Sequence, residues 1–180
     1  MASIRPKRFL LQTGAKYYGG GLALPAIESD PRVPEPNFYY VQEDLLSEYS
    51  RRTGVEWNVV RPAFIIGAVE DAAMNSVYPL AVYAAVQKHK GEKLIWPGDV
   101  AAWEREVIQS SAWLNSYLSE FLTLHEDAKN QAFNAADACY FTYGRLWLEL
   151  AGWYGIDYTL PEVGTEGFQE VPMGFKKNLR

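Results

Sequence analysis

The strongest constraint on the fold is a strand, a helix and a second strand that follow one another near the start of the chain. Residues 8–12 (RFLLQ) form a short apolar run typical of a buried strand, and residues 55–62 (VEWNVVRP) form another that ends at a proline. Between them, residues 37–54 place apolar side chains at helical spacing, with Asn37 as candidate N-cap and Gly54 as the stop. Because a helical crossover returns the chain in parallel, the sequence predicts an α/β fold.

Predicted strands and helices continue to alternate along the remainder of the chain. At 180 residues with 48% hydrophobic content, residues 1–180 are expected to form a single domain, with residues 157–180 as a polar tail. Residues 19–36 are rich in glycine and proline and are predicted to be a long loop. Further elements are expected in this order: an apolar segment at 64–69, a helix at 75–91 interrupted by Pro79, a strand near 93–96, a helix at 110–128, a strand at 131–136 and a helix at 143–155.

Net charge and cysteine content indicate which partners the protein is expected to lack and which cellular compartment it is expected to occupy. A net charge of -5 argues against nucleic acid as a partner, because phosphate binding depends on clustered lysine and arginine. No segment is long and apolar enough for a signal peptide or a membrane span, so no membrane partner is expected. Cys139 is the sole cysteine, which rules out an intramolecular disulfide and favours a cytoplasmic protein. Its apolar surroundings predict a buried small residue rather than a nucleophile.

Most familiar catalytic motifs are missing from the sequence. It contains neither the G-x-G-x-x-G fingerprint for a dinucleotide nor the G-x-S-x-G of a serine nucleophile. The run GAKYYGG begins like a phosphate-binding loop but has Gly20 where the lysine should stand. His89 and His125 each stand alone among charged residues, as on solvated helix ends, so no metal site is expected.

A lysine and two tyrosines remain as candidates for chemistry. Lys16 follows the first strand and Tyr39 and Tyr40 open the next helix, so a right-handed crossover can bring them to one edge of the sheet. An ammonium near a phenol lowers the phenol's pKa from about 10 and makes it a stronger hydrogen-bond donor to a carbonyl. The spacing alone also fits a simpler interpretation, in which the tyrosines pack and Lys16 is a solvated loop residue.

Six sequence blocks within residues 8–156 carry a family resemblance. They are LLQTGAKYYG, NFYYVQEDLL, WNVVRPAFIIGA, MNSVYPLAVYAAVQKHKG, WPGDVAAWE and AKNQAFNAAD. In this order and spacing they resemble the progesterone 5β-reductase and iridoid synthase group of short-chain dehydrogenases/reductases, especially its fungal members. The resemblance implies a Rossmann-like parallel sheet with flanking helices. It also implies reduction of the carbon–carbon double bond of enals and enones with NADPH.

Carried over residue by residue, the family's motifs assign roles to this chain. The lysine of the T-G-x-K-x-Y block is Lys16, and the first tyrosine of the N-F-Y-Y-x-x-E-D block is Tyr39; these are the implied catalytic residues. The implied substrate-binding residues are Tyr17, Phe64, Met74, Asn75 and Trp103. If a nicotinamide is bound, the residues implied to line it are Arg61, Pro62, Ala63 and Ile65. Tyr17 stands where family members usually have a histidine, which leaves the hydrogen bonding around Lys16 open.

The family's upstream half, which holds the adenosine and phosphates, has no counterpart in this sequence. We therefore expect a truncated Rossmann-like sheet that lacks the N-terminal nucleotide-binding half, and no cofactor for this chain alone. The first hypothesis is a cofactor-independent enzyme that polarises the carbonyl of a hydrophobic, terpenoid-like enal or enone to promote cyclisation, Diels–Alder cycloaddition or isomerisation. The second is an NADPH-dependent reductase whose other half is separate or missing, and the third is a non-enzymatic remnant. The open edge of the first strand predicts a homodimer or a rearranged N-terminus that covers it.

Overall fold

The computed structural model describes residues 6–19, 25–68 and 75–161, and these fall into two compact units. Unit 1 contains the chain up to Asn75 together with Ile108–Ala138, and unit 2 contains Ser76–Val107 together with the chain from Cys139 onward. The expectation of a single domain stays a prediction.

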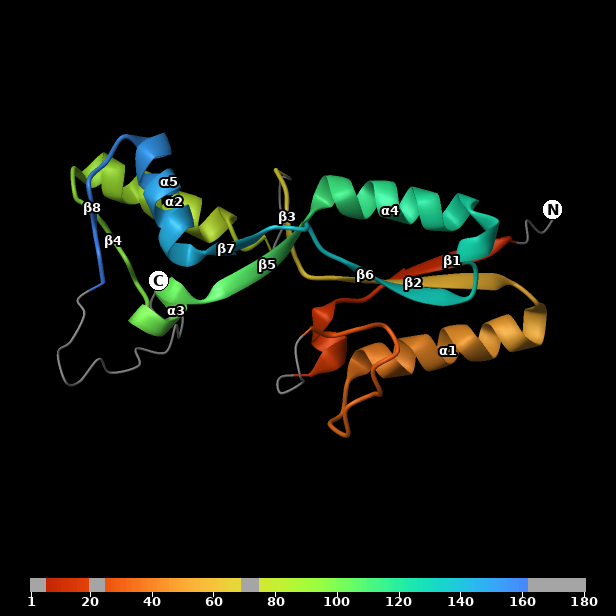
Figure 1. Ribbon diagram of the computed structural model, residues 1–180. Helices are drawn as coiled ribbons and strands as arrows, with labels where there is room; N and C mark the ends of the chain where they lie inside the picture. The colour runs from red at the N-terminus through yellow and green to blue at the C-terminus, as the bar shows by residue number, and fades with distance from the viewer. Residues whose placement is uncertain (1–5, 20–24, 69–74, 162–180) are drawn as a thin grey trace, which may run out of the picture. The chain divides into compact units, whose positions relative to one another are not determined.

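Unit 1 is built on a parallel three-stranded sheet. Its strands are β1 (Arg8–Gln12), β2 (Glu56–Pro62) and β6 (Gln131–Ala135), in the order β1-β2-β6. The helices α1 (Phe38–Thr53) and α4 (Ala112–Leu124) cover opposite faces of this sheet (Figure 1). The predicted strand, helix and strand at the start of the chain, paired in parallel, are thereby confirmed.

Local chemistry accounts for the bounds of α1. The side chain of Asn37 accepts a hydrogen bond from the Tyr39 amide, which satisfies one of the free N–H groups at the start of the helix. Gly54 ends the helix in the left-handed conformation with φ 73°, which costs glycine nothing. Both predicted end residues are confirmed.

The core of unit 1 lies between the sheet and α4. Val60, Leu122, Ala128 and Ala135 are buried there, with Leu10, Leu118 and Phe133 packed around them. The remaining elements of this unit are the short helices η1 (Ala15–Tyr18) and η2 (Glu126–Ala128) and the strand β3 (Phe64–Ile66), which pairs in parallel with the end of β5 (Glu106–Ser111). The parallel sheet edge that carries η1 is where the sequence predicts chemistry.

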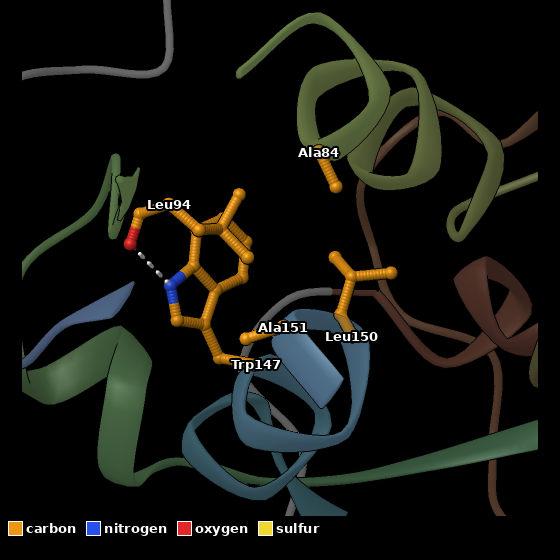
Figure 2. Packing of buried hydrophobic residues seen from close by; sticks show 5 residues of the cluster. All are labelled: Ala84, Leu94, Trp147, Leu150 and Ala151. Carbon is orange, nitrogen blue, oxygen red and sulfur yellow. Dashed lines mark hydrogen bonds between the residues drawn. The ribbon is translucent and has the colours of Figure 1, made fainter. Parts of the chain in front are cut away.

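Unit 2 surrounds a different core. Its helices are α2 (Tyr78–Lys90), α3 (Val100–Glu104) and α5 (Tyr143–Tyr154), and its strands are β4 (Leu94–Ile95), β7 (Tyr140–Thr142) and β8 (Tyr158–Thr159), with β4 and β8 paired in parallel. Figure 2 shows the buried cluster of Ala84, Leu94, Trp147, Leu150 and Ala151, in which the Trp147 indole donates to the Leu94 carbonyl at 3.3 Å.

Several predicted features differ from the structure. Pro79 does not interrupt α2 but stands in its first turn, where the missing N–H has no partner to lose. Cys139 was expected to be buried but is exposed, because it stands in the connection between β6 and β7 and not inside a strand. The helix expected at 110–128 begins only at Ala112, because Ser110 and Ser111 end β5 and Ser111 caps the helix. Among the described residues, no helix is both long and apolar enough to cross a membrane.

Candidate functional site

The hydroxyl of Tyr39 lies at the carboxyl edge of the sheet in unit 1. A methyl group added at Gly14, two residues after β1, would stand 3.1 Å from the Tyr39 hydroxyl and 3.6 Å from the Pro62 carbonyl at the end of β2. The side chain is half-buried, and within the described ranges its hydroxyl makes no hydrogen bond. Tyr39 therefore holds an uncommitted donor beside the backbone of two strand ends.

The hydroxyl of the neighbouring Tyr40 is fully hydrogen-bonded within unit 1. Its hydroxyl donates to the Tyr17 carbonyl at 2.6 Å and accepts from the Val33 amide at 3.0 Å. Its ring packs edge-on against Tyr17 with centroids 5.0 Å apart, and the Arg32 guanidinium lies 4.8 Å from its centroid. These contacts agree with the family register, in which the first tyrosine of the pair carries the chemistry.

Lys16 lies in η1, the short helix after Gly14. Its side chain is exposed and forms no ion pair with the residues that the structure describes. Its backbone carbonyl, by contrast, accepts hydrogen bonds from the Gly19 amide at 3.1 Å and the Asn37 side chain at 2.8 Å. The backbone of Lys16 is thus held in place while its ammonium is available to a ligand.

Arg61 is the centre of a buried polar cluster beneath η1. Its guanidinium carbon lies 3.4 Å from the centroid of the Tyr17 ring, and its nitrogens donate to the Tyr18 hydroxyl and the Glu43 carboxylate at 3.2 Å each. Burial by itself lowers the pKa of Arg61, but the hydrogen bond to Tyr18 and the charge of Glu43 outweigh it and raise the pKa. Asn134 completes the cluster by accepting from the Tyr18 hydroxyl at 2.6 Å.

This cluster bears on two residues that the family resemblance assigned to ligands. Tyr17 is 5% exposed and Arg61 is also 5% exposed, so both side chains lie inside unit 1 and contact protein groups. A substrate contact for Tyr17 and a nicotinamide contact for Arg61 stay predictions. The structure shows in addition that both residues support η1.

The other residues predicted around a nicotinamide follow β2. Pro62 is buried at the strand's end, and the Ala63 amide donates to the Ala135 carbonyl of β6 at 2.9 Å. Ile65 is half-buried in β3, whereas the side chain of Phe64 is 68% exposed. Phe64 is therefore free to contact a hydrophobic ligand, as predicted for a substrate-binding residue.

The remaining predicted substrate residues are spread over the chain. Asn75 donates a hydrogen bond to the Gly67 carbonyl within unit 1, while Met74 lies outside the described residues. Trp103 belongs to unit 2, where it packs over Gly144 and lies edge-on to Trp96 with centroids 5.4 Å apart. The structure thus brings Lys16, Tyr39 and the end of β2 together within unit 1, whereas Trp103 belongs to unit 2.

The sequence prediction missed the partners of Arg61. Glu43 stands within the NFYYVQEDLL block, and Tyr18 and Asn134 also lie in blocks that carry the resemblance. A signal was available, because an arginine inside an apolar strand requires a carboxylate partner when it is buried. Which carboxylate and which hydroxyl it meets depends on contacts with residues 18 and 43 positions away in the sequence.

Known proteins are similar to this chain over most of its length. The sequence profile of the PRISE-like Rossmann-fold domain matches residues 3–178. The chain is 38% identical over 158 residues to the (S)-8-oxocitronellyl enol synthase CYC2 of Camptotheca acuminata, covering 82% of this chain and 40% of that protein. It is 37% identical over 174 residues to the 3-oxo-Δ(4,5)-steroid 5β-reductase of Arabidopsis thaliana, covering 91% of this chain and 45% of that protein.

Solved structures show the same architecture. RMD from Pseudomonas aeruginosa, determined with NADPH, superposes with a TM-score of 0.67 at 20% identity, covering 88% of this chain and 54% of that chain. The chain thus has a Rossmann-like α/β fold with a parallel sheet and flanking helices, and it spans 40% and 45% of the two enzymes compared above. With a family profile that matches almost its whole length, the chain belongs to the PRISE-like Rossmann-fold family.

Proposed function

We propose that unit 1 activates the carbonyl group of a hydrophobic, terpenoid-like enal or enone, with the Tyr39 hydroxyl as hydrogen-bond donor. The observation that carries this proposal is the uncommitted hydroxyl at the sheet edge, 3.1 Å from a methyl placed on Gly14, next to a tyrosine whose hydroxyl is fully used. The oxygen of a conjugated carbonyl gains negative charge as the substrate reacts. A donor aimed at that oxygen stabilises the transition state more than the ground state.

The names of the relatives support this class of substrate. One is named for an oxocitronellyl enol and the other for a 3-oxo-Δ(4,5)-steroid, in which a ketone is conjugated to a double bond. In both compounds a hydrogen-bond donor can bind the oxygen of the enol or ketone group. Phe64, which is largely exposed, offers apolar contact for the hydrocarbon part of such a substrate.

The first candidate for the reaction needs no cofactor. In this form a folded polyunsaturated substrate undergoes cyclisation, Diels–Alder cycloaddition or isomerisation after Tyr39 polarises its carbonyl. Correct orientation of the reacting groups contributes roughly 7–11 kcal/mol in favourable cases. Lys16 then acts through the charge of its ammonium or as a second donor.

The second candidate is an NADPH-dependent reduction of the double bond, and the name of the Arabidopsis relative, a 5β-reductase, favours it. The residues of unit 1 fit one end of such a cofactor, because the Lys16 ammonium is exposed and a cation of this kind binds ribose hydroxyls. NADPH would supply the hydride. Tyr39 would hold the carbonyl oxygen in the same way as in the first candidate, and Lys16 would orient the ribose.

The test compares the unmodified protein with Tyr39→Phe and Lys16→Met, each assayed with and without NADPH. The probes are citral, an acyclic terpenoid enal, and progesterone, a cyclic enone. Tyr39→Phe is expected to lower the rate by about two orders of magnitude because it removes only the donor. Mass spectrometry separates the candidates, since reduction adds two hydrogen atoms to the product and cyclisation or isomerisation adds none.

The outcomes are distinct for each candidate. Turnover without NADPH, with Lys16→Met less harmful than Tyr39→Phe, supports the cofactor-independent enzyme. Strict dependence on NADPH, with both substitutions severe, supports the reductase. Equal turnover by the unmodified protein and Tyr39→Phe would contradict carbonyl activation by Tyr39, and no turnover at all would favour the ligand-binding remnant.

The surface of unit 1 also supports the predicted homodimer. In the described part of the chain β1 has one strand neighbour, β2, so its other edge carries unpaired backbone groups. On α1, the helix between these strands, Phe38, Val41 and Leu45 form an exposed apolar stripe. A second copy of the chain would cover both features. Light scattering that reports a monomer at micromolar concentration, with rapid amide exchange in residues 8–12, would contradict this assembly.

A further inference from the structure

The side chain of Asn37 joins the two candidate catalytic residues. Its oxygen accepts a hydrogen bond from the Tyr39 amide at 3.0 Å, and its nitrogen donates to the Lys16 carbonyl at 2.8 Å. The same nitrogen lies 3.5 Å from the Tyr17 carbonyl. One planar amide group therefore contacts the backbone of Lys16 and of Tyr39, which stand in different elements of the fold.

These two contacts do different things. The bond to the Tyr39 amide caps α1, a role that serine, threonine and aspartate also perform. The bond to the Lys16 carbonyl plays no part in capping α1. It ties the short helix η1 to the start of α1 across 21 positions of sequence. Serine is too short to make both contacts and has no amide nitrogen, so the two functions of Asn37 can be separated by substitution.

We propose that Asn37 is a positioning residue that sets the distance between the Lys16 ammonium and the Tyr39 hydroxyl; this inference rests on the proposed carbonyl activation. The Lys16 side chain is exposed and projects from a helix of four residues, so only its backbone fixes where the ammonium starts. The Tyr40 hydroxyl also bonds η1, but at the Tyr17 carbonyl. Apart from Gly19, the residue that ends η1, Asn37 is the one described residue that bonds the Lys16 carbonyl.

Small displacements of catalytic groups have large effects on rate. A shift of about 1 Å at a reacting centre can cost on the order of 100-fold. Loss of one hydrogen bond that leaves the Tyr40 contact intact is expected to shift Lys16 less than that. We therefore expect Asn37→Ser to lower kcat about tenfold with KM changed less than about twofold, because the substrate's apolar contacts are untouched.

The experiment uses the full chain and four proteins: unmodified, Asn37→Ser, Asn37→Ala and Thr142→Ala. Asn37→Ser keeps a neutral N-cap and removes the bond to Lys16, whereas Asn37→Ala removes both. Thr142→Ala is the matched control, since Thr142 caps α5 in unit 2 by accepting from the Arg145 amide at 3.2 Å. Each cap loss lowers the melting temperature by a few degrees.

Two measurements are made on each protein. Amide hydrogen exchange at Tyr17 and Gly19, the amides bonded within η1, reports the anchoring of Lys16 without any assay of turnover. Initial rates with citral, with and without NADPH, give kcat and KM. The expected result for Asn37→Ser is about tenfold faster exchange in η1 and a lower kcat, both absent in Thr142→Ala.

The possible outcomes each decide the inference. Unchanged exchange in η1 of Asn37→Ser overturns it, and so does a kcat no lower than that of Thr142→Ala. A fall in kcat equal in Asn37→Ala and Asn37→Ser supports positioning through Lys16, while a fall confined to Asn37→Ala overturns it in favour of capping alone. If the unmodified protein turns over no probe, the proposed function fails, and the exchange result alone decides whether Asn37 anchors Lys16.

Discussion

A buried cluster in unit 1 and a buried cluster in unit 2 are stabilised by different kinds of interaction. Around Arg61 in unit 1, a guanidinium, a carboxylate, two tyrosine hydroxyls and an asparagine form directional bonds of 2.6–3.2 Å. Around Trp147 in unit 2, the buried side chains are aliphatic or aromatic, and the indole N–H makes the polar contact of the cluster. The cluster beside the candidate catalytic residues thus uses interactions that fix position, whereas the cluster around Trp147 uses interactions that are mainly non-directional.

This difference has an energetic consequence. Apolar burial contributes stability in proportion to area, whereas a buried charge contributes only when its partners satisfy it. The Arg61 cluster is incomplete, because its Nε atom has no hydrogen-bond partner in the described residues. We infer that the cluster keeps η1 in place at some cost in stability, and that disturbing it alters the site before it unfolds the chain.

The largest loss of stability is expected from a substitution in the apolar cluster of unit 2. Trp147→Ala deletes a side chain that is fully buried, and the free energy of unfolding of unit 2 should fall by about 4 kcal/mol. Hydrogen exchange followed in each unit measures this, with faster exchange in α2 and α5 and little change in β1 and β2. The matched control is Trp153→Ala, since Trp153 is 67% exposed. Equal losses for the two variants would show that the cluster around Trp147 is not the core of the unit.

The next largest loss is expected from Arg61→Met. This change leaves the Glu43 carboxylate partly buried, but Arg32 also contacts Glu43 at 3.4 Å and limits the cost to about 3 kcal/mol. Exchange should quicken in η1 and in the described segment 25–36 because Arg61 also donates to the Glu28 carbonyl at 3.2 Å. Arg52→Met is the control, since Arg52 is exposed. If Arg61→Met stabilises unit 1, the cluster does not anchor η1 through charge.

Local patterns explain which parts of the fold could be predicted. Both strands of the first crossover and the caps of α1 follow from residues adjacent in sequence, so they were predicted with the correct type and nearly the correct bounds. The strand β5 was missed because it begins at the end of a run of three charged residues at 104–106, and because it pairs with β3, more than forty positions earlier. Its pairing is a long-range property that no local window contains.

The candidate site also contains residues that the sequence predicts and residues that it does not. Lys16 and Tyr39 could be proposed because sequence order and crossover handedness bring strand ends and helix starts to one edge. The polar cluster around Arg61 could not be predicted, since Arg61, Tyr18 and Asn134 come from three separate elements. Tyr40 was assigned no chemical role from the family register alone, and only its two backbone contacts show what the hydroxyl does instead.

A smaller effect is expected when the Tyr40 hydroxyl is removed. Tyr40→Phe loses the bonds to the Tyr17 carbonyl and from the Val33 amide, and should destabilise unit 1 by about 1–2 kcal/mol because both backbone groups are only partly solvated. Tyr39→Phe is the matched variant, with a free hydroxyl and little expected change in stability. Denaturant titration of both proteins measures the difference. The reverse order of stability would mean that the two tyrosines have exchanged roles.

The smallest expected effect lies at the other end of the sheet in unit 1, far along β1 and β2 from Tyr39. There the Glu56 carboxylate accepts from Arg8 at 2.9 Å and contacts the Lys129 ammonium at 3.1 Å, and the hydrogen bond from Arg8 lowers the pKa of Glu56 most. A lowered pKa in the folded state gives stability that is present above the unfolded pKa of about 4.3 and is lost as the pH falls through the folded pKa. Glu56→Gln should therefore lower the melting temperature of unit 1 slightly at neutral pH and leave it unchanged in strong acid.

Thermal melts of Glu56→Gln and the unmodified protein at neutral pH and along a falling pH series that ends below the folded pKa of Glu56 test this expectation. Glu149→Gln serves as the control, because Glu149 is exposed and forms no ion pair in the described chain. A difference between Glu56→Gln and the unmodified protein that persists in acid would show that the side chain acts through packing and not through its charge. The ion pairs of Glu56 lie away from η1, so Glu56→Gln should leave amide hydrogen exchange at Tyr17 unchanged. This result would separate the effect of surface charge from that of the buried Arg61 cluster.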